Sequence, residues 1–130
     1  MLVVDASVVV GVLIGARAAP RLQEQRLVAP PLLWPETRSA LHVLWWRGEL
    51  SDAGAEAARE RLVSLEVESA DPAGLGAVAW AIADEFGWAK TYDAEYLALA
   101  RILACRMVTA DGRLRRGAAR LGLVVGPTEL

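Results

Sequence analysis

Two aspartates each follow a short run of aliphatic residues. Asp111 closes the run Met107–Ala110 and precedes Gly112 and an arginine-rich segment with a helical pattern. Asp5 closes the run Leu2–Val4 in the same way, with helix-like sequence behind it. Because open α/β sheets bind ligands at the carboxyl ends of their strands, we predict that the fold brings these two acids together.

Two further carboxylates stand near predicted helix starts. Asp93 lies at the entrance of an apolar segment, and Glu36 shares the apolar face in the first turn of its helix. Helix capping or the helix dipole explains any one of the acids alone. Four converging carboxylates, however, repel one another, and such a site either raises a pKa or requires a cation. Oxygen donors without cysteine or histidine favour Mg²⁺ or Mn²⁺.

Carboxylate-bound Mg²⁺ suits phosphodiester cleavage, because the ion lowers the pKa of a bound water, orients the phosphate and neutralises developing charge. Arginine presents a planar fork of donors that matches phosphate. Four arginines follow Asp111 closely, namely Arg113, Arg115, Arg116 and Arg120. We interpret them as candidates for holding neighbouring phosphates, the alternative being a solvated helix face.

Predicted strands alternate with predicted helices along the chain. The strands are 1–5, 27–29, 65–68, 106–110 and 123–125, and the helices are 8–16, 20–25, 32–47, 51–65, 72–86, 94–105 and 113–121. Ser7 is the predicted cap of the first helix, whose valines leave strand as a rival. The alternation predicts a single domain over residues 1–130, a three-layer α/β/α sandwich with a mostly parallel sheet.

Composition narrows the class of protein. Hydrophobic residues make up 55% of the chain, which excludes disorder, and no apolar stretch reaches the roughly 20 residues of a membrane span. The start of the chain lacks the basic region of a secretory signal. Cys105, the single cysteine, fits a reducing cytoplasm, and its apolar neighbours predict burial. The net charge of −2 argues against a general nucleic-acid binder. We expect a cytoplasmic protein.

Four segments resemble the motifs of the PIN-domain family, in the order in which the family carries them. They are Asp5-Ala6-Ser7, Ala29–Glu36, Tyr92–Ala100 and Val108–Asp111. The resemblance covers essentially the whole chain. Within the family, the chain is similar to the VapC-type toxins, which are the ribonuclease half of a toxin–antitoxin pair. The resemblance implies a PIN-like fold and an endoribonuclease that uses Mg²⁺, or Mn²⁺ in its place, to hydrolyse RNA phosphodiester bonds through a metal-activated water.

The resemblance also implies the catalytic and metal-binding residues. Asp5 and Asp93 match the family's firmest metal ligands, and Asp111 and Glu36 match positions that act directly or through water. Glu95 lies two residues past Asp93 in a predicted helix, so we expect it to point elsewhere and exclude it.

Substrate and partners follow from the same resemblance. Ser7 and Thr109 match small hydroxyl positions that support the acids or touch substrate, and Arg113 and Arg116 are our candidates for binding substrate phosphates. The family implies a homodimer, and a VapB-type antitoxin that blocks the site. The alternative function is a catalytically inactive PIN-like module that binds RNA or serves as a scaffold.

The sequence lacks residues that other classes of protein require. A signalling receiver domain requires a lysine at a late strand end, whereas Lys90 is the only lysine and precedes a helix. His42, the only histidine, excludes a ribonuclease with paired histidines and is predicted at the surface. Trp45 and Trp46 are adjacent and cannot both face the same core, so we expect at least one to be partly exposed, either as an interface anchor or in rim packing beneath a loop. The remaining tryptophans are predicted in the core, namely Trp34, Trp80 and Trp88.

Overall fold

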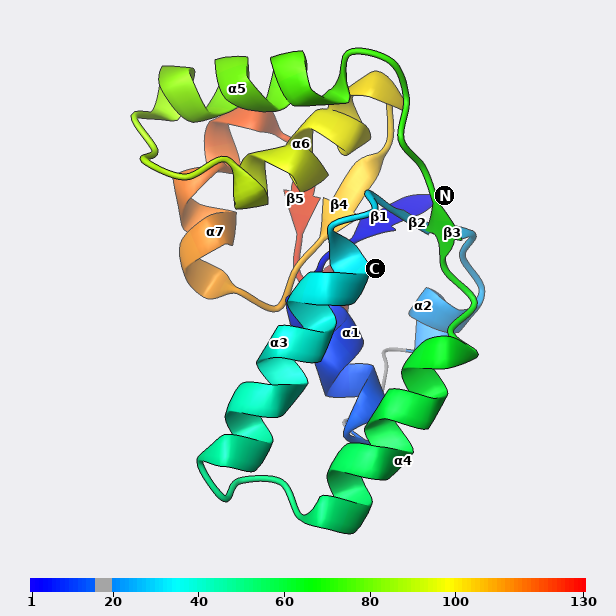
Figure 1. Ribbon diagram of the computed structural model, residues 1–130. Helices are drawn as coiled ribbons and strands as arrows, with labels where there is room; N and C mark the ends of the chain where they lie inside the picture. Colours follow the sequence, from blue (N-terminus) through cyan, green and yellow to red (C-terminus); the bar gives the residue numbers. More distant parts are fainter. Residues whose placement is uncertain (16–19) are drawn as a thin grey trace.

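The computed structural model describes residues 1–15 and 20–130, which form a five-stranded parallel sheet with helices packed around it (Figure 1). The strands are β1 (Leu2–Val4), β2 (Leu27–Ala29), β3 (Glu68–Ser69), β4 (Arg106–Val108) and β5 (Val124–Val125). Their order across the sheet is β3-β2-β1-β4-β5. The predicted α/β sandwich with a parallel sheet is therefore confirmed.

The helices divide between two regions of Figure 1. They are α1 (Ala6–Leu13), α2 (Pro20–Gln23), α3 (Leu33–Trp46), α4 (Asp52–Val63), α5 (Leu75–Phe86), α6 (Tyr92–Ile102) and α7 (Gly112–Gly117). Helix α6 packs on β1 and β4 and carries α5 on its outer side, whereas α3 and α4 lie side by side and pack against α1. Two 3₁₀ turns, Ala119–Leu121 and Pro127–Glu129, complete the described elements.

The direction in which the chain adds strands to the sheet reverses between β1 and β4. The chain runs outward from β1 through β2 to β3, then returns to add β4 and β5 on the other side of β1. Val4 pairs with Val108 in parallel register, so the residues that follow them, Asp5 and Thr109, leave the sheet at the same edge. Such a switch point is where open α/β sheets bind ligands.

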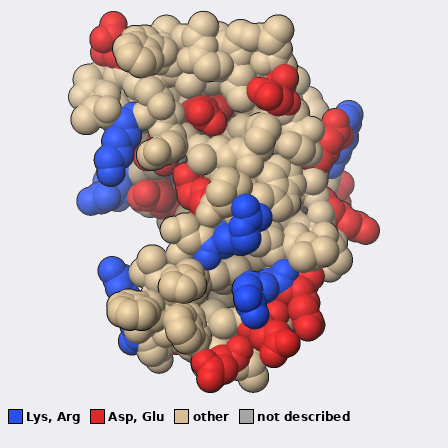
Figure 2. Space-filling model, in the orientation of Figure 1, with Lys and Arg blue, Asp and Glu red and all other residues tan. Residues whose placement is uncertain are grey.

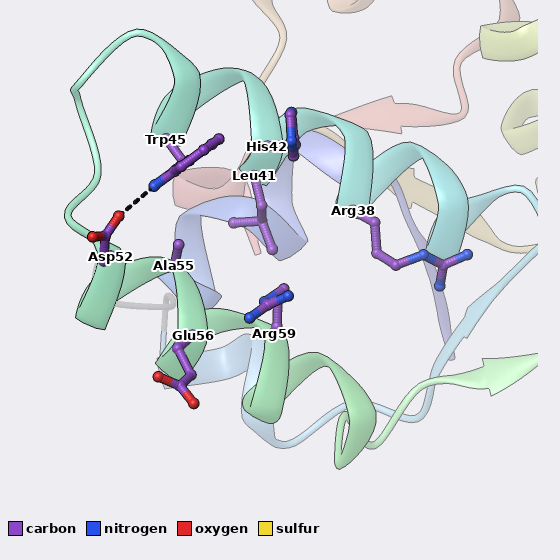
Figure 3. A pocket seen from close by; sticks show the side chains of 8 residues that line it. All are labelled: Arg38, Leu41, His42, Trp45, Asp52, Ala55, Glu56 and Arg59. Carbon is purple, nitrogen blue, oxygen red and sulfur yellow. Dashed lines mark hydrogen bonds between the residues drawn. The ribbon is translucent and has the colours of Figure 1, made fainter.

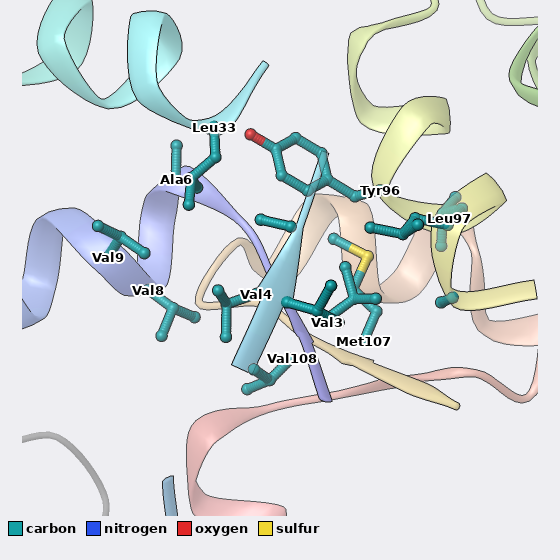
Figure 4. Packing of buried hydrophobic residues seen from close by; sticks show 14 of the residues in the cluster. Val3, Val4, Ala6, Val8, Val9, Leu33, Tyr96, Leu97, Met107 and Val108 are labelled. Carbon is teal, nitrogen blue, oxygen red and sulfur yellow. The ribbon is translucent and has the colours of Figure 1, made fainter. Parts of the chain in front are cut away.

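The buried core lies under helix α6. Its residues Tyr96–Ala100 are fully buried, as are Val3 and Val4 of β1 and Met107 of β4 (Figure 4). A helix this apolar is expected between a sheet and a second helix layer. Within the described ranges, no helix is both long enough and apolar enough to span a bilayer.

Helices α1, α5 and α6 begin two or three residues away from their predicted starts, and α6 starts at Tyr92 rather than at 94. Helix α1 starts at Ala6, because Asp5 rather than Ser7 is its N-cap and accepts a hydrogen bond from the Val8 amide at 3.1 Å. The predicted end of this helix at residue 16 lies outside the described residues. Helix α5 starts after Gly74, whose φ of 84° is left-handed and breaks the predicted continuation from position 72.

Two other elements differ from prediction for local reasons. The predicted strand 65–68 is replaced by β3, because the Val67 amide bonds the Leu65 carbonyl at 2.9 Å in a tight turn. The predicted helix 113–121 divides at Gly117, and its second part is the 3₁₀ turn Ala119–Leu121. Glycine in a helix interior is destabilising, which accounts for the break.

The exposure of two side chains, Trp80 and Cys105, corrects the prediction that both are buried. Trp80 is 71% exposed, since it lies beside rather than on the α5 face that buries Ala79 and Ile82. Cys105 is only partly buried, at the edge of the sheet after α6. Trp34 and Trp88 are half-buried and pack against the core.

Candidate active site

Asp5 is buried at the end of β1 and is held by three hydrogen bonds. Its carboxylate accepts from the Ser7 hydroxyl at 2.6 Å, from the Val8 amide and from the Thr109 hydroxyl. Burial raises the pKa of this carboxyl, and the hydrogen bonds oppose the shift. Asp5 is therefore the cap of α1, and it is at the same time a fixed negative group at the switch point, so the capping role does not exclude a role in a site.

The two hydroxyls connect the ends of β1 and β4. Thr109 is 1% exposed, and its Oγ1 also accepts from the Asp111 amide at 3.0 Å. The Ser7 Oγ accepts from the Ala110 amide at 2.9 Å. A side chain as buried as Thr109 does not reach a substrate, so of its two expected roles only support of the acids remains. Ser7, half-buried, has the same supporting contacts.

Asp111 begins helix α7 on the same edge of the sheet. Its Oδ1 accepts from the amides of Arg113 and Leu114, at 2.8 and 3.3 Å. Among the described residues, no donor is bonded to its second oxygen, Oδ2. The side chain is half-buried. Asp111 thus combines an N-cap with a free carboxylate oxygen near the end of β4.

Asp93 comes from a different element, the first turn of α6. Burial among protein atoms raises the pKa of its carboxyl, and the charges of Asp111 and Asp5 raise it further, while Arg113 opposes the shift. Asp93 remains exposed, so water screens part of these effects. In the described part of the chain, it accepts no hydrogen bond.

Glu36 reaches the same region from the first turn of α3. Its Oε1 accepts a hydrogen bond from the Tyr96 hydroxyl at 3.2 Å. Burial raises the pKa of the Glu36 carboxyl, and the bond from Tyr96 opposes the shift. Negative charges raise it further, and they belong to Asp93, Asp5 and Glu95. Glu95 makes the smallest of these contributions, and its exclusion from the metal-binding acids stays a prediction.

Sequence reasoning missed Tyr96. Its position three residues after Asp93 places both on one side of α6, which was the available signal. Burial and the neighbouring charge of Glu36 raise the pKa of its hydroxyl above the usual range, so the group stays protonated and acts as a donor.

The four predicted acids thus converge closely enough for the charges of Asp5 and Asp111 to raise the pKa of Asp93, and for those of Asp93 and Asp5 to raise the pKa of Glu36. Figure 2 shows a notch between the part that carries α5 to α7 and the part that carries α3 and α4, with acidic side chains along its upper wall and basic ones beside them. Over residues 1–15 and 20–130, there is no group of three or more His, Cys, Asp or Glu side chains placed to hold a metal ion. Mg²⁺ does not require one, because it keeps several waters and binds through one or two carboxylates. The donor set therefore fits Mg²⁺.

The arginines after Asp111 separate into two groups. Arg115 pairs with Glu129 at 3.5 Å, and Arg120 pairs with Glu85 at 3.5 Å and covers the Phe86 ring at 4.1 Å. These two arginines are therefore already engaged with acidic side chains of the protein itself. The other two are exposed: Arg113 acts electrostatically on Asp93, and Arg116 lies beside Gly112, where an added Cβ would be 3.0 Å from its guanidinium.

A separate pocket of about 520 Å³ lies between α3 and α4 (Figure 3). Trp45 forms part of its wall and donates to Asp52 at 2.6 Å, and the exposed His42 ring lies 5.3 Å from the Trp45 ring. Trp46 is 77% exposed. None of the four acids lines this pocket, so it is distinct from the candidate active site, and both tryptophans belong to the surface.

Comparisons with known proteins identify the family to which the chain belongs. The chain is 35% identical to a VapC ribonuclease of Mycobacterium bovis and to ribonuclease VapC9 of Mycobacterium tuberculosis, over 98% of this chain and 99% of each relative. A toxin–antitoxin complex from Klebsiella pneumoniae has a similar fold, with a TM-score of 0.69, 17% identity and 98% of both chains covered. So does PAE2754 from Pyrobaculum aerophilum, with a TM-score of 0.69 and 22% identity over 98% of this chain and 90% of that one. The PIN domain model matches residues 2–119, and the chain therefore belongs to the PIN-domain family.

Proposed function

We propose that this protein is a Mg²⁺-dependent endoribonuclease and the toxin of a VapBC-type toxin–antitoxin pair, acting in the cytoplasm. The observation that supports the proposal is the convergence of four carboxylates, from four separate elements, at the switch point between β1 and β4. The mycobacterial relatives named as VapC ribonucleases, similar along the whole chain, support the same activity.

The acids have distinct parts in this proposal. Asp5 and Asp93 would hold the ion directly, Asp5 in a fixed orientation and Asp93 with both oxygens accessible. Asp111 would use its uncapped oxygen, and Glu36 would act directly or orient a water. When bound, Mg²⁺ lowers the pKa of a water, orients the scissile phosphate and neutralises charge on the leaving oxygen, and Mn²⁺ supplies the same chemistry.

Arg113 and Arg116 would bind the phosphates that flank the scissile bond. Both are exposed, and neither is in an ion pair within the described residues, in contrast to Arg115 and Arg120. The net charge of −2 provides no broad basic surface. Recognition would therefore rest on the local shape of the RNA and on single-stranded loops rather than on long stretches of backbone.

The proposal includes two protein partners. The fold of the Klebsiella toxin–antitoxin complex supports a cognate VapB-type antitoxin, which would bind across the acidic site and exclude RNA. The family resemblance supports a homodimer. Light scattering of the purified chain tests the dimer, and co-expression with the neighbouring reading frame tests the antitoxin: a true antitoxin forms a complex that suppresses cleavage.

An RNA-cleavage assay tests the activity. Wild type is compared with Asp93→Asn in Mg²⁺ and in EDTA, with Asp84→Asn, an exposed acid on α5, as the matched control. We expect cleavage by wild type and Asp84→Asn in Mg²⁺ only. Cleavage that persists in EDTA or in Asp93→Asn would contradict metal catalysis, and RNA binding without any cleavage would favour the inactive scaffold.

A further inference from the structure

We propose that Tyr96 is a positioning residue that holds the Glu36 carboxylate toward the acidic site. This inference rests on the proposed nuclease function and deepens it. The geometry that carries it is a single hydrogen bond between two elements that are distant in sequence: the Tyr96 hydroxyl of α6 donates to the Glu36 Oε1 of α3 at 3.2 Å.

The Tyr96 ring is closely packed in the core. Tyr96 has an exposed fraction of 0%, and its neighbours along α6 from Leu97 to Ala100 are also fully buried. Figure 4 shows the ring among the core side chains, with its oxygen directed toward the side on which Leu33 and Ala6 lie. Leu33 opens helix α3 and has an exposed fraction of 0%, so both partners of the hydrogen bond stand on fixed backbone. The hydroxyl is therefore a rigid anchor.

Glu36 is the acid that most needs such an anchor. Its side chain is longer than that of an aspartate and only half-buried, and Tyr96 is its single hydrogen-bond donor within the described ranges. Asp5, in comparison, is fixed by three donors. Without Tyr96, repulsion by Asp93 and Asp5 would drive the Glu36 carboxylate outward into solvent.

One turn of helix α6 therefore supplies two parts of the site. Asp93 contributes a carboxylate, and Tyr96, three residues later on the same side, orients a second carboxylate from α3. Donors that orient metal-binding carboxylates commonly change metal affinity or activity by tenfold or more when they are removed. Because Tyr96 is fully buried, it does not touch RNA, and its effect must pass through Glu36.

The test is a double-mutant cycle with Tyr96→Phe and Glu36→Ala, measured by Mn²⁺ binding in electron paramagnetic resonance and by kcat and KM for RNA cleavage. Phenylalanine keeps the ring and removes only the hydroxyl. In the wild-type background we expect Tyr96→Phe to weaken Mn²⁺ binding and to lower kcat, each roughly tenfold, with KM for RNA unchanged. In the Glu36→Ala background we expect the same substitution to have less than about a twofold effect, because no carboxylate remains to be oriented.

Tyr92→Phe is the matched control, since Tyr92 lies on the same helix but is 56% exposed. It should leave Mn²⁺ binding and cleavage at wild-type values. Equal losses from Tyr96→Phe in both backgrounds, or no loss in either, would overturn the positioning role. Failure of the nuclease proposal can be distinguished from failure of the positioning role. If wild type cleaves no RNA, the nuclease proposal fails, but the Mn²⁺-binding cycle still measures the coupling between Tyr96 and Glu36. Absence of Mn²⁺ binding by wild type would overturn both proposals.

Discussion

The Thr109 hydroxyl donates a hydrogen bond to the Asp5 carboxylate, joining two residues that are 104 positions apart in the sequence. The parallel register of Val4 with Val108 places them at the same edge of the sheet. Thr109 in turn accepts from the amide of Asp111, so one hydroxyl contacts the carboxylate of Asp5 and the backbone of Asp111, two residues that follow adjacent strands. The Asp5 carboxylate, the most deeply buried of the four acids, is therefore held by the neutral hydroxyl of Thr109.

Replacing Thr109 by valine tests this contact. Valine preserves the shape of the side chain but leaves a buried carboxylate without one donor and the Asp111 amide without its acceptor. We expect the free energy of unfolding in urea to fall by about 1–3 kcal/mol, and cleavage to decrease. Thr109→Ser keeps the hydroxyl and should retain most of both. A valine variant as stable as wild type would contradict the role assigned to Thr109.

The three raised carboxyl pKa values predict how the metal-free protein responds to pH. For Asp5, Glu36 and Asp93, the folded state binds protons more tightly than the unfolded chain, whose ordinary values are 3.8 for Asp and 4.5 for Glu. Their contribution to stability is therefore fully present below the ordinary values and is lost as pH rises through the raised ones. Mg²⁺ should raise the melting temperature more at pH 7 than at pH 4, where protons compete for the same oxygens.

Calorimetric melting with and without Mg²⁺ at the two pH values measures this difference. Asp84→Asn serves as a control, since Asp84 is exposed on α5 and should leave the Mg²⁺ response unchanged. An equal effect of Mg²⁺ at both pH values would show that the ion does not bind these carboxylates.

Asp93→Asn should separate stability from activity. Asparagine removes a charge that the neighbouring acids repel, and in the described part of the chain Asp93 accepts no hydrogen bond that would be lost. We expect the metal-free variant to gain about a few tenths of a kcal/mol, a small value because Asp93 is exposed and its interactions are screened. Mg²⁺-dependent cleavage should be abolished. Chemical denaturation at pH 7 in EDTA measures the gain, and a loss of stability would contradict the repulsion.

Substitution of Arg113 or Arg116 by glutamine should weaken RNA binding. Each arginine is predicted to contact one phosphate, so each variant should raise KM by about three- to tenfold and reduce the slope of log K against log salt by about one. Arg101→Gln, at the exposed end of α6, is the matched control and should leave KM unchanged. Unchanged KM in both test variants would assign Arg113 and Arg116 to a solvated helix face.

Local sequence was enough to find the four acids and most of the elements that carry them. The aliphatic runs before Asp5 and Asp111 correspond to β1 and β4, and the turn of α3 that carries Glu36 was recognisable from its apolar periodicity. Helix α6 was predicted from a segment that is apolar on nearly every side, but it begins at Tyr92 rather than at 94, so Asp93 lies inside its first turn and not before it. Glycines with positive φ also end helices at predicted places, as Gly87 does after α5. These features depend on near neighbours in the chain, and the sequence records them directly.

Tertiary structure alone decided the contacts between distant residues. The bond from Tyr96 to Glu36 spans 60 residues, and it exists because α6 packs on the sheet beside the start of α3. The engagement of Arg115 with Glu129 and the exposure of Trp80 likewise depend on which surfaces meet. Periodicity says which side of an element is apolar, but the order of the strands and the packing of helices on them determine which side chains meet across that surface.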